Sequence, residues 1–266
     1  MTVARWKLVN LVTLVVVIAL NGLAASGGMS GQSIGAIANQ YSSLFLPANY
    51  VFGIWSLIYL GQFVAAGYQL LRGDGSAQYI ERLGPWWLVA GVLNVAWISL
   101  FSFAQFALAL VVMLVFLVSL IIVTERLRTP ASGPPPRRSV VERAVRGAVE
   151  RWPFDIYLAW ISVAVIANTF QFAHVVNFGG FGIPEATWSV SMMGVATLLG
   201  LLMAFRRGNW LFPMVVAWAV RGIGARFIDL PAIASVTVWL APVGAALGLV
   251  LWFLGRSHRR RQVFPE

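Results

Sequence analysis

Eight apolar runs, each close in length to the thickness of a bilayer, dominate this chain of 266 residues. A helix needs about 20 apolar residues to cross the hydrocarbon core of a membrane. Charged residues make up only 11% of the chain, whereas a soluble domain carries about 25%. Backbone polar groups in lipid are satisfied only in helices or closed barrels, and these runs lack the alternating pattern of barrel strands. The sequence therefore predicts an all-α, polytopic membrane helical bundle.

The apolar runs give the order of the expected membrane helices. The first run ends in residues 22–26, which resemble a signal-peptidase site, so a cleaved signal peptide is the alternative to a first membrane helix. Runs 85–103 and 106–124 are almost contiguous, which predicts a tight antiparallel hairpin. We expect eight transmembrane helices at about 8–26, 50–71, 85–103, 106–124, 153–176, 188–205, 210–227 and 232–254.

Basic residues are clustered between the apolar runs and give the chain a net charge of +10. Such clusters are typical of cytoplasmic membrane loops and do not indicate nucleic-acid binding. If both termini lie in the cytoplasm, all of the 19 basic residues except Arg221 and Arg226 fall on that side. We therefore expect an integral, multi-pass protein of a bacterial inner (cytoplasmic) membrane with both termini cytoplasmic. The chain has no cysteine, which excludes disulfides and cysteine-ligated metal sites.

The longest polar segment, residues 125–152, contains two kinds of sequence. Its first part is rich in proline and arginine and reads as a flexible or polyproline-like linker. Its second part places Val141, Val145 and Trp152 on one helical face and arginines elsewhere. This pattern predicts a short amphipathic helix on the cytoplasmic membrane surface, with a solvated loop helix as an equal alternative.

Three of the expected helices carry aromatic and amide side chains at helical spacing. Amides inside a bilayer face the bundle rather than lipid. A flat hydrophobic ligand needs aromatic walls and a few polar groups, so these stripes predict a binding site; the alternative is that the amides only join helices and the tryptophans only mark the membrane interfaces. The stripes are Phe52, Trp55, Tyr59 and Gln62; Asn94, Trp97 and Phe101; and Trp160, Ala164, Asn168 and Gln171.

Taken in order, these patterns resemble a known family. The helix of residues 50–71 contains VFGIWSLIY, the next helix contains NVAWISLF, and residues 160–168 read WISVAVIAN. With twelve tryptophans overall, the first 178 residues resemble the TspO/MBR family, which comprises the tryptophan-rich sensory proteins and the translocator protein. The chain looks like a divergent member, because several family prolines are displaced and residues 179–266 form an extension of three helices.

The resemblance implies a five-helix bundle in residues 1–178, which includes the cytoplasmic loop 125–152, and an added segment in residues 179–266. It also implies an aromatic pocket between the second, third and fifth helices, covered by the loop before the second helix. Family ligands are tetrapyrroles, including protoporphyrin and haem, and sterols. A non-covalent porphyrin or haem is therefore the only cofactor to consider, and a protein metal site is not expected. The expected ligand-binding residues are Phe52, Trp55, Tyr59, Asn94, Trp97, Phe101, Trp160, Asn168, Gln171 and His174.

Two polar residues near the expected outer side have less certain roles. His174 is a candidate axial ligand for haem, although a lone histidine there is more often simply packed. Arg221 either joins an ion-pair cluster with Arg226, Glu185 and Asp229 or anchors an anionic ligand group.

Three functions fit the sequence. The first is binding or transport of a flat lipophilic ligand, the second a porphyrin-modifying enzyme, and the third a non-catalytic accessory subunit of a larger membrane complex. No acid–base pair or nucleophile motif favours the enzyme. The expected partners are lipid, the small molecule, and a second copy or a complex partner that would bind through the last three helices. If the function is ligand binding or transport, binding should survive deletion of residues 185–266; the other two functions do not predict this.

Overall fold

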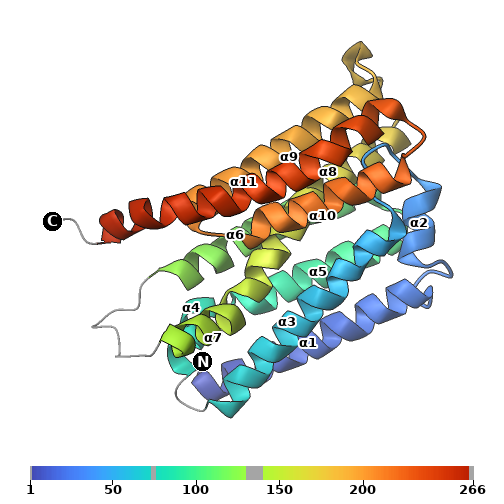
Figure 1. Cartoon of the computed structure of the whole chain (residues 1–266). Helices are drawn as coiled ribbons and strands as arrows, with labels where there is room; N and C mark the ends of the chain where they lie inside the picture. The colour runs from blue at the N-terminus through green and yellow to red at the C-terminus, as the bar shows by residue number, and fades with distance from the viewer. Residues whose placement is uncertain (1, 73–75, 130–139, 264–266) are drawn as a thin grey trace. The chain divides into compact units, whose positions relative to one another are not determined.

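A computed structural model describes residues 2–72, 76–129 and 140–263 of the chain. Within these ranges the protein is almost entirely helical and contains no strand (Figure 1). The chain divides into two compact units. Unit 1 consists of residues 1–37 and 54–158, and unit 2 consists of residues 38–53 and 159–266.

All eight predicted helices are present, and their observed bounds lie within about ten residues of the predicted ones. They are α1 (Val3–Ser26), α3 (Ile54–Leu71), α5 (Trp86–Ser102), α6 (Phe106–Arg128), α8 (Trp152–Val175), α9 (Glu185–Arg207), α10 (Leu211–Arg226) and α11 (Pro231–Val263). The predicted helix in the polar segment is α7 (Val140–Glu150). Short helices also occur where the sequence predicts loops: α2 (Ile34–Gln40), α4 (Ala77–Leu83) and η3 (Gly180–Gly182). The first turn of the helix predicted at 50–71 is instead the 3-10 helix η1 (Asn49–Gly53).

Six of the described helices are long and apolar enough to cross a membrane. A seventh span results if α4 and α5, which meet at a bend of 50°, are counted together. Helix α10 has 16 residues and is about 24 Å long, which is shorter than a hydrocarbon core of about 30 Å. The protein is thus an integral, multi-pass membrane protein, and the prediction of an eighth crossing depends on α10.

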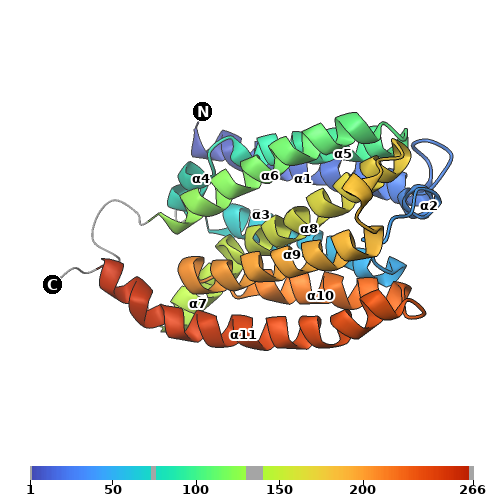
Figure 2. The same cartoon turned by 90° about the horizontal axis from the view of Figure 1, so that it is seen from above.

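Unit 1 is built around α1, α5 and α6. Helix α5 packs against both α1 and α6, and α3 packs against α1 (Figure 2). The contact between α1 and α5 is close because Gly91 has no side chain: a Cβ there would lie 2.3 Å from Thr13 Cγ2. The predicted hairpin is confirmed, since only residues 103–105 separate α5 from α6 and Ala104 adopts a left-handed φ of 55°.

Unit 2 contains α9, α10 and α11, which pack against one another in pairs (Figures 1 and 2). Gly244 and Gly248 of α11, which are four residues apart, form a packing face. A Cβ at Gly248 would lie 2.5 Å from Pro213 Cγ of α10, and one at Gly244 would lie 2.9 Å from Thr197 Cγ2 of α9. Small residues therefore let α11 approach both neighbours closely, as is common between membrane helices.

The two units do not follow the predicted segments 1–178 and 179–266. Residues 38–53 lie in unit 2 with the last three helices, and α8 passes from unit 1 to unit 2 after Leu158. Compactness and family relationship are different criteria, so the predicted division into family segments stays a prediction.

Candidate functional site

An aromatic cluster from α3, α5 and α8 lies in unit 1. Trp55 of α3 stacks on Trp97 of α5, with ring centroids 5.9 Å apart and planes inclined by 23°. Trp55 also stacks on Tyr59 at 5.7 Å and meets Tyr157 of α8 edge to face at 5.8 Å. Trp97 continues the cluster to Phe101 at 5.6 Å. Four predicted site residues thus lie in one contiguous set of rings; Trp97 and Phe101 are buried, whereas Trp55 and Tyr59 are half-buried.

Three hydrogen-bonded polar side chains, of which Asn94 and Tyr157 are buried and Asn21 is half-buried, adjoin this cluster. Asn94 of α5 donates a hydrogen bond from Nδ2 to the Tyr157 hydroxyl at 2.8 Å. The Asn94 Oδ1 accepts a bond from Asn21 Nδ2 of α1 at 2.6 Å. Asn94 is fully buried, and both ends of its amide are already bonded within the protein. The geometry favours a positioning role for Asn94. This agrees with the alternative interpretation of the sequence, in which the amides only join helices.

The other predicted site residues lie in unit 2. Phe52 of η1 meets Trp160 of α8 edge to face, with centroids 6.2 Å apart. Asn168 is buried and donates from Nδ2 to the Ala164 carbonyl of its own helix at 2.9 Å. Gln171 is buried, and its Nε2 has no hydrogen-bond partner among the described residues. His174 is exposed at the end of α8.

The described side chains do not form a metal centre. No group of three or more His, Asp or Glu residues gathers in this part of the chain. His174 therefore lacks neighbours that would complete a protein metal site, and its proposed bond to a haem iron stays a prediction.

Residues 38–53, which we call the connecting segment, are tied to the C-terminal helices within unit 2. Glu185 and Ser189 of α9 bond both backbone groups of Leu44: the Leu44 amide donates to Glu185 Oε1 at 2.7 Å, and the Ser189 hydroxyl donates to the Leu44 carbonyl at 2.7 Å. The Ala48 amide donates to the Gly222 carbonyl of α10 at 3.0 Å. The segment that carries Phe52 is therefore held by α9 and α10.

Glycine and aromatic residues complete this attachment. A Cβ at Gly222 would lie 2.1 Å from Val51 Cγ2, so only glycine leaves room for the connecting segment. Trp218 of α10 donates its indole N–H to the Val51 carbonyl at 3.2 Å and meets Tyr50 edge to face at 5.2 Å. Val51 is therefore held both by a hydrogen bond from Trp218 and by close packing against Gly222.

The predicted ion-pair cluster is not formed. Arg226 instead donates to Asn39 Oδ1 at 2.7 Å and to Ser42 Oγ at 3.1 Å in the connecting segment. Glu185 accepts from a backbone amide, and no described salt bridge includes Asp229 or Arg221. Uncharged side chains satisfy Arg226 because the connecting segment, which the sequence did not place beside α10, occupies that position. Arg221 is exposed on α10.

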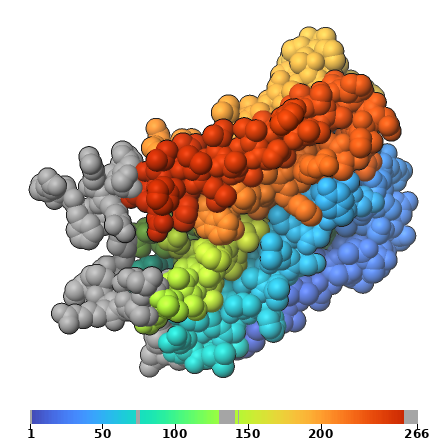
Figure 3. Space-filling model, in the orientation of Figure 1, coloured from blue at the N-terminus to red at the C-terminus, as the bar shows by residue number. Residues whose placement is uncertain are grey.

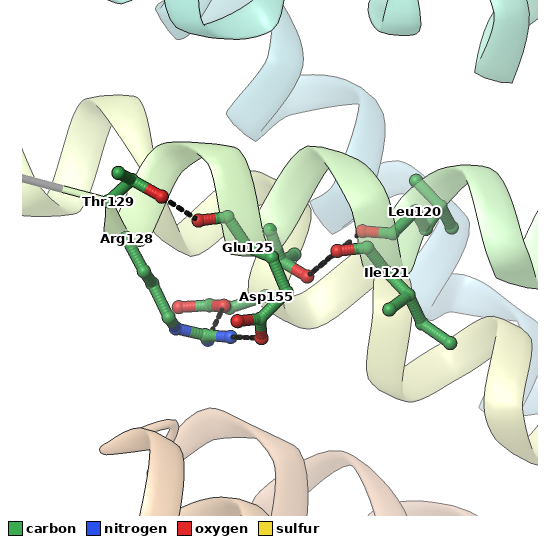
Figure 4. Close-up of polar contacts among 7 residues, drawn as sticks. Leu120, Ile121, Glu125, Arg128, Thr129 and Asp155 are labelled. Atoms are coloured by element: carbon green, nitrogen blue, oxygen red, sulfur yellow. Dashed lines mark hydrogen bonds and ion pairs between the residues drawn. The ribbon is translucent and has the colours of Figure 1, made fainter.

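A buried ion pair that the sequence does not predict lies in unit 1. Figure 4 shows the guanidinium of Arg128, at the end of α6, facing the carboxylates of Asp155 and Glu125. Asp155 lies near the start of α8 and is almost fully buried. The sequence explains Asp155 only by its favourable place near a helix N-terminus. Its second role is to join the ends of α6 and α8.

Neither Tyr157 nor Asn21, the two partners of Asn94, is among the predicted site residues, although the sequence contains a signal for each. Tyr157 lies three residues before Trp160, so it extends the stripe on α8 by one helical turn. Asn21 lies eleven residues after Asn10, which places both amides on one face of α1. Asn10 indeed donates to Gln69 Oε1 of α3 at 2.9 Å. A search of the first helix for polar stripes would have found both asparagines.

Comparison with known proteins gives one family match. A family model described as TSPO-like protein matches residues 7–253. The match continues through α9, α10 and most of α11, so the three helices taken as an extension lie inside the matched region. No curated protein and no solved structure gives a significant match.

Proposed function

The chain belongs to the TSPO-like family, and from this we propose that it binds or transports a flat lipophilic molecule of tetrapyrrole or sterol type. The aromatic cluster of unit 1 is the proposed binding site. The observation that carries the proposal is the stack of Trp55 on Trp97.

The stacked pair is suited to a flat ligand for a geometric reason. Its rings are nearly parallel, and their centroids are 5.9 Å apart. A planar ring that enters between them can contact both indole faces, each at about 3.5–4.0 Å. The rings would then lie about 7–8 Å apart, so the pair must open by roughly 1–2 Å. Aromatic faces retain favourable stacking in such an arrangement.

The hydrogen bonds of Asn94 support the proposal because they hold together the helices that carry the aromatic cluster. Asn94 connects α1, through Asn21, with α8, through Tyr157. A rigid frame lowers the cost of ordering side chains when a ligand binds. Trp97 lies three residues after Asn94 on the same helix, so the network orients the helix that presents it.

The attachment of the connecting segment suggests a role for the C-terminal helices. Within unit 2, α9 and α10 hold residues 38–53, which include the end of the loop that the family resemblance assigns to the cover of a ligand. Deletion of residues 185–266 would remove Glu185, Ser189 and Gly222, the partners of this segment. We therefore expect deletion to impair binding, which replaces the expectation from sequence that binding would survive it.

Titration with protoporphyrin IX tests the proposal. Quenching of tryptophan fluorescence gives a dissociation constant for the purified protein, and Trp55→Phe and Trp97→Phe should each weaken binding by about 1 kcal/mol or more, or roughly fivefold. Trp239→Phe is the matched control, because Trp239 is 72% exposed on α11 and belongs to no described aromatic pair of the cluster. Equal affinity in all three variants, or no binding of protoporphyrin or a sterol, would refute the proposed site.

We also propose a bacterial inner-membrane location with both termini in the cytoplasm. The support is the distribution of basic residues, which places only Arg221 and Arg226 on the opposite side. This topology requires α10 to cross the membrane. Single cysteines near each terminus, labelled in intact cells and in lysed cells with an impermeant maleimide, test it in a chain without native cysteine. Labelling of the C-terminal site in intact cells would contradict it.

A further inference from the structure

The connection between α8 and α9 has an unusual surface composition. Residues 176–184 contain no charged side chain, and four large apolar residues in this stretch are exposed: Val176, Phe178, Phe181 and Ile183. Phe181 is 83% exposed, among the highest values of any large apolar residue described. Figure 3 shows the gold-coloured part of the chain around these residues standing out from the surface of unit 2.

The backbone holds this tip in a defined conformation. Phe181 has a left-handed φ of 56°, between Gly180 at 59° and Gly182 at 77°. The left-handed region is unfavourable for a bulky residue and persists only where surrounding contacts impose it. Trp188 of α9 supplies such a contact by donating its indole N–H to the Gly180 carbonyl at 3.0 Å.

Further bonds close the turn. The Gly182 amide donates to the Gly179 carbonyl at 3.0 Å, and the Ile183 amide donates to the Gly180 carbonyl at 3.1 Å. Phe178 and Phe181 meet edge to face, with centroids 5.1 Å apart. The result is a compact, exposed pair of phenyl rings.

We propose that this aromatic tip, Phe178 and Phe181 with Val176 and Ile183, inserts into the boundary between lipid headgroups and acyl chains. Its neighbours in the chain fix its depth. Helices Trp152–Val175 and Glu185–Arg207 are both candidate membrane spans, so the nine residues that join them lie where the chain leaves and re-enters the bilayer. Phenylalanine and other apolar side chains of interfacial segments are buried at that level, and the absence of charge removes the usual cost of insertion.

The proposed consequence is an anchor for the outer end of α8. This helix carries Trp160, Asn168 and Gln171, and the tip follows it directly. Insertion of two phenyl rings would oppose axial sliding of α8 relative to the bilayer. The proposal does not depend on the identity of the ligand.

Site-directed spin labelling tests the inference, because a chain without cysteine accepts a single label. The full-length protein with Phe181→Cys, or in a second variant Phe178→Cys, is labelled and reconstituted in vesicles of neutral and anionic phospholipids. Collision with oxygen, which concentrates in lipid, is compared with collision with nickel-EDDA, which concentrates in water. Val195→Cys, exposed on α9, is the lipid-facing control, and Gln32→Cys, exposed in the α1–α2 loop, is the aqueous control.

The proposal predicts that both tip positions give an oxygen-to-nickel collision ratio between the two controls and closer to that of Val195→Cys. A ratio equal to that of Gln32→Cys would overturn it, because the tip would then lie in water. Dipolar broadening between labels, relieved by dilution with unlabelled protein, would also overturn it and assign the tip to contact with a second copy.

Discussion

Replacement of Gly222 by alanine tests whether α10 holds the connecting segment. The added Cβ would lie 2.1 Å from Val51 Cγ2 and 3.3 Å from Pro47 Cβ. Val51 is fully buried and has a stiff, β-branched side chain, so it has little freedom to move away. The segment must shift, and the bond from the Ala48 amide to the Gly222 carbonyl should weaken with it.

The size of the effect follows from a matched substitution. Gly222 and Gly194 both lie inside helices, so each alanine variant gains the same helix propensity of about 1 kcal/mol. A Cβ at Gly194 meets nothing within 4 Å, and the comparison therefore isolates the clash. Overpacking costs about 1–3 kcal/mol, which corresponds to about a 5- to 150-fold change in an equilibrium constant.

Hydrogen exchange followed by mass spectrometry gives the readout. Peptides that cover residues 44–53 should exchange about 5 to 150 times faster in Gly222→Ala than in Gly194→Ala, under conditions where exchange reports the opening equilibrium. Peptides of α6, in the other unit, should be unaffected in both variants. Equal exchange of residues 44–53 in the two variants would refute the role assigned to Gly222.

Three further substitutions test individual contacts. Glu185→Ala removes a charge-assisted acceptor from a backbone amide, and we expect about a tenfold loss of protection at that amide, about 1.5 kcal/mol; unchanged exchange would contradict the contact. Arg128→Met should destabilise the protein by about 3–5 kcal/mol, because it leaves Asp155 buried and unpaired. In the double variant Arg128→Met with Asp155→Leu, the melting temperature in detergent should return most of the way to that of the wild type. No recovery in the double variant would show that the unpaired Asp155 is not the cause. Tyr157→Phe removes the acceptor of Asn94, and we expect a loss of about 1–3 kcal/mol in the free energy of unfolding; an unchanged melting temperature would show that the bond contributes little.

The helices could be predicted from sequence because membrane insertion imposes a strong and local signal. A run of about 20 apolar residues has few other stable structures in lipid, and each of the eight runs forms a helix. The sequence predicts loops in place of the short helices α2 and α4, since seven residues leave little periodicity to detect. Helix α10 is a weaker prediction as a membrane crossing, because its 16 residues are near the shortest length that spans the hydrocarbon core.

The candidate site could be predicted only in part. Helical spacing placed Trp55, Tyr59, Trp97 and Phe101 on inward stripes, and the rings do meet. Spacing along one helix does not reveal which residue of another helix it contacts, so the bond from Asn94 to Tyr157 was not foreseen. The attachment of residues 38–53 to α9 and α10 was hidden for a stronger reason, since it joins backbone groups to side chains more than 140 residues away.

Charged residues were the least predictable part of the chain. Their expected place on the same outer side suggests an ion-pair cluster of Arg226 with Glu185 and Asp229, but the amide of Asn39 and the hydroxyl of Ser42 bind Arg226. Conversely, Arg128 and Asp155 pair across a loop whose path the sequence does not define. The partner of a long charged side chain depends on tertiary contacts. Sequence composition alone does not show which of several possible partners it binds.

A structure of the protein determined with protoporphyrin IX would test the central proposal most directly. We expect a flat ligand stacked between Trp55 and Trp97, whose ring centroids move apart from 5.9 Å to about 7–8 Å. Ligand bound elsewhere, with the Trp55–Trp97 stack unchanged, would contradict it.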